Sequence, residues 1–408
     1  MSAPPSTAHQ PKNKHNRETI AVNHGINSDS NHGAVIPPLY LSSTFAFPGF
    51  DQKGEYDYTR SGNPTRDQLA EALSALEGGK GAVITSSGMA AVHLVTQLLE
   101  AGDVLIAPHD CYGGCHRLFS AAAKKGQFEL QWVPLWETEN AVAEISRVRP
   151  KIVWIETPSN PLLRITDVEA IAAAAHTVGA LVVVDNTFLS PAGQSPISLG
   201  ADIVLHSTTK YINGHSDVVG GAVIAADEQL LEDLAWWANC LGLTGSPFDS
   251  FQTLRGLRTL GVRYQRHQEI AGQIATALDA NELVGKVYYP GLASHPGHDI
   301  AARQQAGFGA MISFELDAAE EEIPVFLQEL QLFTLAESLG GVESLVAHPA
   351  SMTHAAMSEE DQQTAGISRT LLRLSVGIEH VDDLLSDLGN GFEAVLRYRK
   401  KQAVRSVA

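Results

Sequence analysis

The chain of 408 residues repeats one pattern several times: a short, almost wholly apolar run followed by a stretch with helical spacing. The runs include "KIVWIE" at 151–156, "LVVVD" at 181–185, "ADIVLH" at 201–206 and "GGAVIAA" at 220–226. Strands with so few polar residues are buried on both faces, as in a parallel sheet covered by helices on both sides. The sequence therefore predicts a large, doubly wound α/β unit.

Helical spacing fills the segments between these runs. Residues 65–77 carry apolar side chains every three or four positions, with Thr65 and Gln68 at capping-box spacing and Gly78 as a stop signal. A short strand then turns at Gly88 into a second amphipathic helix. This alternation of strand and helix is typical of βαβ units.

The pattern changes past about residue 265. A long helical stretch comes first, followed by strand candidates at 309–316 and 370–379. An amphipathic helix from Val381 to about Arg399 follows the second strand. These features predict a smaller C-terminal α/β domain.

Charge and cysteine content narrow the function classes. With 46 acidic and 28 basic residues the net charge is -18, which disfavours binding to nucleic acid or to an anionic membrane. The three cysteines, Cys111, Cys115 and Cys240, are too few for a disulfide framework and indicate a reducing compartment. Because no apolar stretch reaches membrane-spanning length, we expect a cytoplasmic protein.

One lysine follows a predicted strand end among hydroxyl groups. In "HSTTKYING", Lys210 comes four residues after His206, beside Ser207 and Thr209. Side chains at this edge of an open α/β sheet face the crevice where ligands bind. Two interpretations are open: Lys210 is an exposed loop lysine, or its amine is held beside an anion and used chemically.

Two further features fall at predicted strand ends. The turn "TSSGMAA" offers Gly88 and free amides at a helix start, which suits a phosphate but is also found in ordinary turns. Asp185 ends an apolar run, so its carboxylate needs a partner unless it caps a turn. A cofactor with a phosphate, a basic ring nitrogen and an aldehyde for Lys210 would use all three features, and pyridoxal phosphate is such a molecule.

Nine longer motifs resemble a known family. They are "YTRSGNPTRDQLAEAL", "SSGMAAV", "PHDCYGGCHRLF", "ETPSNPLL", "VVDNTFLSP", "HSTTKYINGHSDVVGG", "RGLRTL", "FTLAESLGGVESL" and "LLRLSVGIE". From about Thr19 to about Leu396 the chain is similar to the pyridoxal phosphate (PLP) enzymes of cysteine and methionine metabolism. The resemblance implies the fold of aspartate aminotransferase, fold type I: a large, mostly parallel, doubly wound domain and a smaller C-terminal α/β domain.

The resemblance also implies how pyridoxal 5'-phosphate is held. Lys210 matches the family's Schiff-base lysine. The backbone amides of Gly88 and Met89 and the hydroxyls of Ser207 and Thr209 match phosphate ligands.

Ring contacts and a shared site are implied in the same way. Tyr112 would stack on the pyridine ring, Asp185 would pair with its nitrogen, and Asn160 would lie near its phenolic oxygen and the substrate carboxylate. Tyr58 and Arg60 would reach the phosphate of a neighbouring subunit. The implied assembly is a homotetramer, a dimer of dimers with shared active sites.

Substrate residues follow from the same resemblance. Arg373 would clamp the α-carboxylate, for which its planar fork is suited, and Arg117 would meet the distal end of the substrate. Glu337 matches the γ-synthases and γ-lyases, and Ser338 matches the residue that steadies the lysine. Gly114 stands where methionine γ-lyases carry a cysteine.

Within the family, "DLAWWANCLGLTG", "RQQAGFGAMISFEL" and "ESLVAHPASMTHAAM" look most like the proteobacterial cystathionine γ-synthase branch. That branch implies γ-replacement of an O-acylhomoserine, with succinyl as the expected acyl group, by cysteine, giving cystathionine and succinate in methionine biosynthesis by transsulfuration. Lys210, Tyr112 and Asp185 are the expected catalytic residues. Ser61 departs from synthases that carry a second arginine there. Cystathionine γ-lyase and O-acylhomoserine sulfhydrylase remain alternatives.

A metal site is the alternative for "HDCYGGCH", where His109, Cys111, Cys115 and His116 lie close together. This spacing fits no familiar zinc pattern, so no metal is predicted. A relative that only binds or regulates would be expected to lack the lysine, aspartate and arginine named above.

Composition and the family resemblance together predict four segments. Composition indicates a disordered tail at residues 1–18, and the resemblance implies that 19–64 contact a neighbouring subunit, that 65–264 form the PLP-binding domain and that 265–408 form the small domain.

Overall fold

The computed structural model describes residues 15–355 and 357–407. Most of the predicted tail, residues 1–18, lies outside the described residues. The first described helix, α1, spans Arg17–Asn23.

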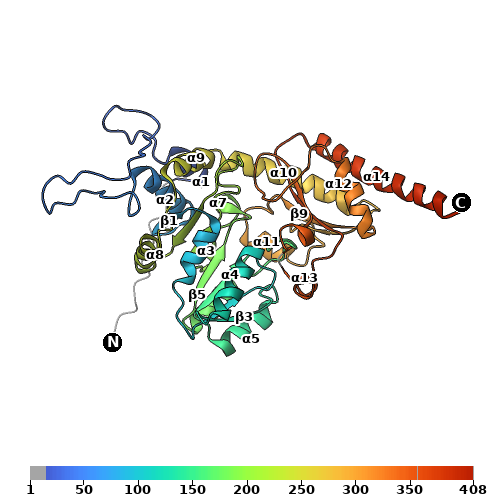
Figure 1. Ribbon diagram of the computed structural model, residues 1–408, viewed down its shortest axis with the longest axis horizontal. Coiled ribbons are helices and arrows are strands. Elements are labelled where there is room, and N and C mark those ends of the chain that lie inside the picture. Colours follow the sequence, from blue (N-terminus) through green and yellow to red (C-terminus); the bar gives the residue numbers. More distant parts are fainter. Residues whose placement is uncertain (1–14, 356, 408) are drawn as a thin grey trace.

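A seven-stranded sheet forms the larger layer (Figure 1). Its order is β1-β7-β6-β5-β4-β2-β3, and β7 runs antiparallel to both of its neighbours while the other pairings are parallel. The strands are β1 Gly81–Thr85, β2 Val104–Ala107, β3 Glu129–Trp132, β4 Ile152–Glu156, β5 Leu181–Asp185, β6 Ile203–His206 and β7 Gly221–Ala225. The mostly parallel, doubly wound sheet expected from the apolar runs is confirmed.

Alternate residues of the central strands pack into two separate cores. In β5, Val182 and Val184 join the core on one face of the sheet, whereas Val183 joins the core on the other. Helices α3, α4 and α8 contribute to the second core, and α2, α5 and α6 contribute to the first. These helices are α2 Pro64–Glu77, α3 Gly88–Thr96, α4 Gly113–Lys124, α5 Thr138–Val148, α6 Val168–Thr177 and α8 Glu228–Leu241. Burial on both faces explains why the strands are apolar throughout.

A five-stranded sheet with the order β10-β11-β12-β9-β8 forms the smaller layer. Its strands are β8 Val284–Tyr288, β9 Met311–Leu316, β10 Thr334–Leu335, β11 Leu345–Ala347 and β12 Leu371–Ser375. The remaining helices are α7 Ser190–Gly193, α9 Pro247–Leu257, α10 Leu260–Asp279, α11 His298–Gln304, α12 Ile323–Glu329, α13 Glu359–Ala365 and α14 Val381–Val407. Short 3-10 turns occur at Pro196–Leu199, Glu320–Glu322 and Pro349–Ser351.

Two helix ends differ from the sequence prediction. Helix α2 is capped by Asn63, whose side chain accepts the amides of Thr65 and Arg66, and not by a capping box that begins at Thr65. Pro64 occupies the first turn, where its missing N–H costs no hydrogen bond. Helix α14 continues to Val407, past the predicted end near Arg399, and its end projects from the body (Figure 1).

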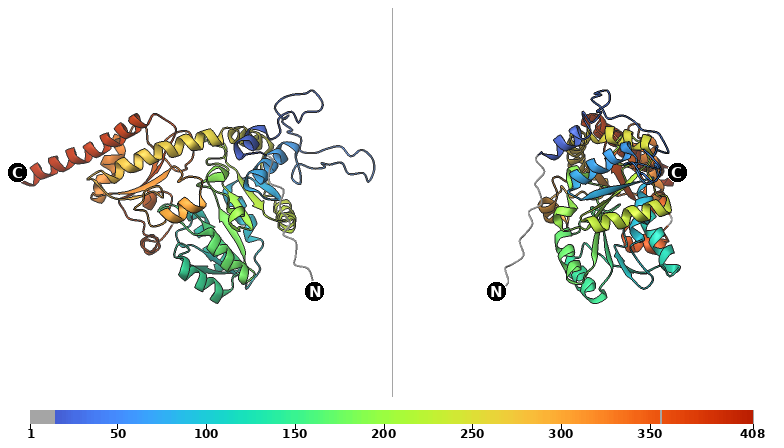
Figure 2. Two further views of the ribbon diagram at one scale, coloured as in Figure 1. Left: turned by 180° about the vertical axis from the view of Figure 1, so that it is seen from behind. Right: turned by 90° about the vertical axis from the view of Figure 1, so that its left-hand side faces the viewer.

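The segment 28–62, called the N-terminal arm below, extends away from the body as two long loops (Figure 2). Phe50 is fully exposed, and Leu41 and Phe47 are also exposed. Apolar side chains this accessible pack little against the rest of the described chain.

Within the described range, no helix combines the length and the apolar character needed to cross a membrane.

Candidate active site

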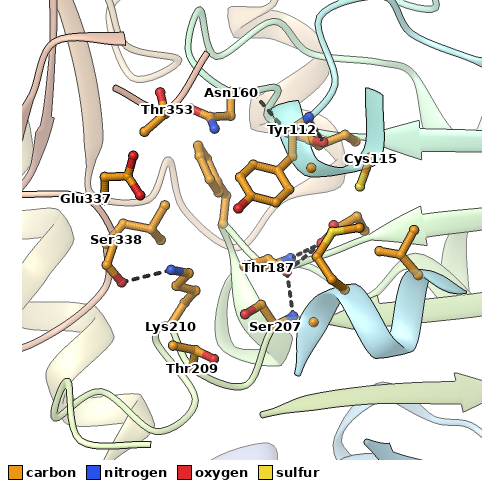
Figure 3. Close-up of a pocket in the computed structure, with 18 of the residues that line it drawn as sticks. Tyr112, Cys115, Asn160, Thr187, Ser207, Thr209, Lys210, Glu337, Ser338 and Thr353 are labelled. Atoms are coloured by element: carbon orange, nitrogen blue, oxygen red, sulfur yellow. Dashed lines mark hydrogen bonds between the residues drawn. The ribbon is translucent and has the colours of Figure 1, made fainter. Parts of the chain in front are cut away.

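A pocket of about 380 Å³ opens at the carboxyl ends of β4, β5 and β6 (Figure 3). The seven-stranded sheet supplies its floor, and segments next to β10 and β12 of the small sheet supply the opposite wall. Among the predicted site residues, the lining includes Gly88, Met89, Tyr112, Arg117, Asn160, Asp185, Ser207, Thr209, Lys210, Glu337, Ser338 and Arg373. Only Tyr58 and Arg60 of the predicted set are absent from this lining.

Lys210 reaches across the pocket to the small-sheet side. Its Nζ donates a hydrogen bond of 2.8 Å to the Oγ of Ser338 (Figure 3). The pKa of Lys210 is lowered to about 8, chiefly by burial and also by the positive charge of Arg373, against the opposing charge of Glu337. About a tenth of the amine is therefore neutral, and nucleophilic, at pH 7, far more than for an ordinary lysine.

Ser338 is held in a strained conformation between the two cationic side chains. Its φ is +89°, which a non-glycine residue adopts only when its surroundings impose it. Arg373 donates from Nη2 to the Ser338 carbonyl at 2.9 Å. This contact fixes the backbone that presents the Ser338 hydroxyl to Lys210.

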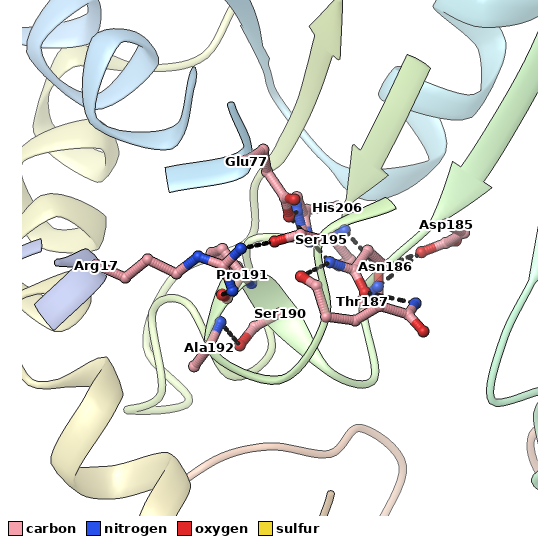
Figure 4. Close-up of polar contacts among 12 residues, drawn as sticks. Arg17, Glu77, Asp185, Asn186, Thr187, Ser190, Pro191, Ala192, Ser195 and His206 are labelled. Carbon is pink, nitrogen blue, oxygen red and sulfur yellow. Dashed lines mark hydrogen bonds and ion pairs between the residues drawn. The ribbon is translucent and has the colours of Figure 1, made fainter. Parts of the chain in front are cut away.

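Asp185 is oriented by the residue two positions later. Both the hydroxyl and the amide of Thr187 donate to Oδ1 of Asp185, at 2.5 and 3.0 Å (Figure 4). The Oδ2 atom accepts no hydrogen bond from any residue in the described range, and Asp185 lines the pocket. Burial raises the pKa of Asp185, while the Thr187 hydrogen bonds and the charge of His206 lower it.

Thr187 also joins Asp185 to the next strand. Its Oγ1 accepts the amide of Ser207 at 2.9 Å, immediately after β6. One hydroxyl thus links the carboxylate at the end of β5 to the serine predicted to bind phosphate.

A second polar group lies on the other face of the sheet. His206 contacts Glu77 Oε1 at 2.6 Å, and Asn186 donates to the same oxygen at 2.9 Å (Figure 4). The side chains of Glu77 and His206 are fully buried. The alternation along β5 and β6 sends Asp185 to the pocket and these side chains away from it.

The start of α3 forms a cradle without side-chain obstruction. The amides of Gly88 and Met89 are in the first turn, where no intrahelical acceptor is available, and Ser87 caps the amide of Ala90. A Cβ on Gly88 would lie 2.8 Å from the Cβ of Ser207, so only glycine leaves this space open. The helix dipole favours an anion here.

The hydroxyl of Thr209, which is predicted to bind phosphate, contacts the backbone of Gly220. Its hydroxyl donates to the carbonyl of Gly220 at 3.2 Å and accepts the Gly220 amide at 3.0 Å. Its single O–H is thus already used, and binding a phosphate oxygen would require it to leave Gly220.

A carboxylate-binding group lies opposite Lys210. Arg373 of β12 is 2% exposed and donates from Nη1 to Asn160 Oδ1 at 2.8 Å. Its Nε has no hydrogen-bond partner in the described part of the chain. Burial lowers the pKa of Arg373 to about 10, which still leaves it charged at neutral pH. A buried, incompletely paired guanidinium is suited to bind an anionic ligand group.

Opposite charges occupy the more accessible part of the pocket. Arg117 on α4 and Glu337 after β10 line it, and both are exposed. Burial raises the pKa of Tyr112, which Arg117 lowers and Glu337 raises further. The charges of both residues therefore act on the aromatic ring that lies between the two walls.

Tyr58 and Arg60 belong to the N-terminal arm. Arg60 donates from Nη1 to both the carbonyl and the Oδ1 of Asn239, at 2.7 Å each, and lies over the Tyr58 ring. Tyr58 is about half exposed.

The histidines of "HDCYGGCH" contact aromatic rings. His116 stacks on Trp132 with 4.6 Å between ring centroids, and His109 lies 5.0 Å from Trp136. Within residues 15–355 and 357–407, no three His, Cys, Asp or Glu side chains are grouped to hold a metal ion.

A family model described as Cys/Met metabolism PLP-dependent enzyme matches residues 18–393. The chain belongs to this family. The match extends from α1 almost to the end of α14, so both sheets and the whole pocket lie within it.

Relatives within the family support the same placement. Cystathionine γ-synthase of Escherichia coli is 56% identical over 92% of this chain and 97% of its own length. Cystathionine γ-lyase of Dictyostelium discoideum is 45% identical over 92% of this chain and 97% of its own. Crystal structures of cystathionine γ-synthase from Xanthomonas oryzae pv. oryzae, with aminoacrylate and cysteine or with cystathionine, superpose with a TM-score of 0.93 at 61% identity, covering 94% of this chain and 100% of that chain.

PLP, the cofactor of this PLP-dependent family, matches the groups in the pocket. The α3 cradle at Gly88 accepts an anion, Asp185 Oδ2 is free to accept a ring N–H, and Lys210 supplies a partly neutral amine. Among residues 15–355 and 357–407, each of these groups lacks a complete set of partners, as expected of a site built around a ligand.

Sequence reasoning missed several pocket residues. Thr187, Ser87, Glu156 and Thr353 all line the pocket. Thr187 and Glu156 lie within the motifs "VVDNTFLSP" and "ETPSNPLL". Their positions at the ends of β5 and β4 were the available signal, but their hydrogen bonds required the folded structure.

Proposed function

We propose that the protein is a cystathionine γ-synthase, which joins an O-acylhomoserine, with O-succinylhomoserine as the expected form, to L-cysteine and releases cystathionine and succinate. The observation that carries this proposal is the presence of Arg117 and Glu337 in one pocket with Lys210 and Arg373. The synthases named above are 56–61% identical to this chain, compared with 45% for the γ-lyase, which supports the choice of reaction.

The cofactor half of the site consists of side chains from the large sheet. When bound, PLP supplies an electron-accepting ring that stabilises negative charge on the substrate α-carbon. Asp185 Oδ2 would accept the ring N–H and keep that nitrogen protonated. Tyr112 would cover one ring face, and the amides of Gly88 and Met89 with the Ser207 hydroxyl would bind the phosphate.

The substrate half consists of residues on the opposite wall. Arg373 would bind the α-carboxylate, with Asn160 beside it, and so fix the α-carbon near Lys210. The Nζ of Lys210 would then take the α-proton, help to remove a β-proton and later return protons, with Ser338 holding the amine in place. Tyr112 would assist these transfers.

The accessible charges would select the two substrates. Arg117 would attract the carboxylate at the far end of a succinyl group. Glu337 would orient the ammonium group of the incoming cysteine. During the reaction the γ-carbon–oxygen bond breaks, succinate leaves with that electron pair, and the cysteine sulfur forms the new bond to the γ-carbon after losing its proton.

The proposed assembly is a homotetramer, a dimer of dimers in which the two chains of each dimer share their active sites. The exposed apolar side chains of the arm support a second copy of this chain as the partner, and Tyr58 and Arg60 would enter the partner's pocket. We further propose a cytoplasmic location, a role in methionine biosynthesis, and the domain division at residues 64 and 264.

Product analysis tests the reaction. The purified holoenzyme is incubated with O-succinyl- or O-acetylhomoserine and with cysteine or sulfide, and products are identified by mass. Cystathionine and succinate from the succinyl ester and cysteine are expected. Cleavage of cystathionine that is faster than its synthesis would instead identify a γ-lyase, and preferential use of sulfide would identify a sulfhydrylase.

A further inference from the structure

A second carboxyl group lies beside Asp185 in the pocket wall. Glu156 ends β4, and the β4–β5 pairing places it directly opposite Asp185. Trp154 of β4 and Val183 of β5 share the core on one face, so Glu156 and Asp185, two residues later on each strand, face the same side. Glu156 lines the pocket and is 6% exposed.

Glu156 binds the main chain at two other site residues. Its Oε2 accepts the amide of Tyr112 at 2.7 Å, and its Oε1 accepts the amide of Asn160 at 3.2 Å. Tyr112 is the N-cap residue of α4, and Asn160 in turn receives a hydrogen bond from Arg373. The carboxyl group of Glu156 therefore fixes the backbone of Tyr112, whose ring is proposed to stack on the cofactor. It also fixes the backbone of Asn160, which contacts Arg373.

Among the residues that the structure describes, no positively charged side chain pairs with Glu156. The side-chain hydrogen bonds that it makes in the described part of the chain are to the two amides, and no ion pair includes it. The titratable groups around it are Asp185 from β5, Asp110 and Cys111 from the segment after β2, and Tyr112 and Cys115 from the start of α4. Ionising Glu156 would place a buried negative charge beside other acidic groups.

Glu156 and Asp185 differ in the neighbouring groups that stabilise their ionised forms. Burial raises the pKa of Glu156 well above its usual range, and the charges of Asp185 and Asp110 raise it further, although the amides of Tyr112 and Asn160 oppose this. Asp185 has the hydroxyl and amide of Thr187 and the charge of His206 to lower its pKa. Burial still raises the pKa of Asp185 overall, but the pKa of Glu156 is raised well above its usual range, so Glu156 is the carboxyl group of this wall that holds a proton more readily.

We propose that Glu156 is a positioning residue that acts as a neutral carboxylic acid, fixing Tyr112 and Asn160 through their amides and leaving Asp185 as the ionised carboxylate for the cofactor ring nitrogen. This inference rests on the proposed roles of Asp185 and Tyr112.

Infrared spectroscopy of the holoenzyme tests the protonation state. The carbonyl-stretch band of a protonated carboxyl group is compared between wild type and Glu156→Gln at neutral pH. The band should be present in wild type and lost in Glu156→Gln, but retained in the control Glu139→Gln, which changes an exposed residue of α5. An equal band in wild type and Glu156→Gln would overturn the proposal.

The cofactor absorption gives an independent readout. Glutamine resembles a neutral acid and keeps one acceptor oxygen, so the pH midpoint of the visible absorption should stay the same in Glu156→Gln. Loss of an ionised carboxylate would instead move that midpoint by about one unit or more, and this result would also overturn the proposal.

Glu156→Ala tests the positioning role. Loss of both amide acceptors should weaken PLP binding and raise KM, each about tenfold, more than Glu156→Gln does. Equal, near-wild-type values for the two variants would contradict positioning.

Asp185→Asn separates this inference from the proposed function. It should change the cofactor absorption and weaken PLP binding. An unchanged Asp185→Asn spectrum would count against the proposed role of Asp185. If Asp185→Asn changes the spectrum as expected but Glu156→Gln also alters it, the result would count against the proposed role of Glu156 alone.

Discussion

The carboxyl edge of the seven-stranded sheet and the N-terminal arm are built in opposite ways. At the sheet edge, Asp185, Thr187 and Ser207 form continuous hydrogen bonds within one chain, and the strands below them are buried on both faces. In the arm, Phe50 and Leu41 are exposed.

This comparison indicates that one chain completes the sheet edge by itself, whereas the arm needs a second molecule to cover its apolar side chains. The sheet edge brings Tyr112, Asp185 and Lys210, which are far apart in sequence, into one pocket. Arg60 of the arm binds Asn239 of its own chain and stays outside its own pocket. We therefore expect substitutions at the sheet edge to act within one chain and substitutions in the arm to act between chains.

The largest effect is expected at the sheet edge, from Lys210→Ala. Turnover of the O-acylhomoserine with cysteine should fall by about 10³-fold or more, because the proposed general base and the proposed covalent attachment point are both lost. PLP should still bind. Mass analysis of products measures turnover, and borohydride treatment followed by peptide mapping should label residue 210 in wild type only. Label on another lysine in wild type would contradict the assignment.

Arg60→Ala tests the arm. Removing the proposed charge-assisted contacts of Arg60 to the phosphate in a partner's pocket should weaken PLP binding by about 10- to 100-fold, and Arg60→Lys should weaken it less. PLP affinity is measured by titration of the apoenzyme.

Mixing Arg60→Ala with Lys210→Ala sharpens the comparison. If the arm enters a partner's pocket, a mixed dimer has one complete site, so random reassembly should restore about a quarter of wild-type activity. The unmixed variants are the controls. Absence of recovery in verified mixed dimers would show that Arg60 serves its own chain.

The pH dependence of Lys210 reports on the pocket of one chain and not on the arm. Attack of this amine on PLP requires its neutral form, so the rate of reconstitution should rise about tenfold per pH unit below the pKa of about 8 and level off above it. Stopped-flow absorbance measures this rate. Arg373→Gln should move the midpoint upward, because a positive charge that opposes protonation is removed. A midpoint near the ordinary lysine pKa in wild type would contradict burial of the amine.

Phe50→Ser should have the smallest effect. The side chain is fully exposed in one chain, so the thermal unfolding of dissociated subunits should not change. If the arm packs on a second copy, the dimer dissociation constant should rise several-fold to about tenfold. Val404→Ser, which changes an exposed apolar residue on α14, is the matched control for analytical ultracentrifugation. Equal effects of the two substitutions would argue against a packed arm.

The apolar runs predicted most of the large sheet because burial on both faces excludes polar residues over the length of a strand. The run at 220–226 was as apolar as the others, yet β7 is antiparallel, since burial reports the environment of a strand and not its direction. Strand β3 was missed, because "ELQW" is short and only partly buried. Local signals also placed the start of α2 too late, at Thr65, because Pro64 and Asn63 together determine its cap.

Sequence alone determined the chemistry that the chain can supply: a lysine, an aspartate and a glycine turn at strand ends, within motifs long enough to identify the family. Tertiary structure decided which groups meet. The contacts of Lys210 with Ser338, of Arg373 with Asn160, and of Glu156 with Tyr112 join residues between 44 and 213 positions apart. Such contacts depend on strand order and register, and the protonation of Glu156 and Asp185 depends on their shared burial. Neither property is encoded in any local stretch of residues.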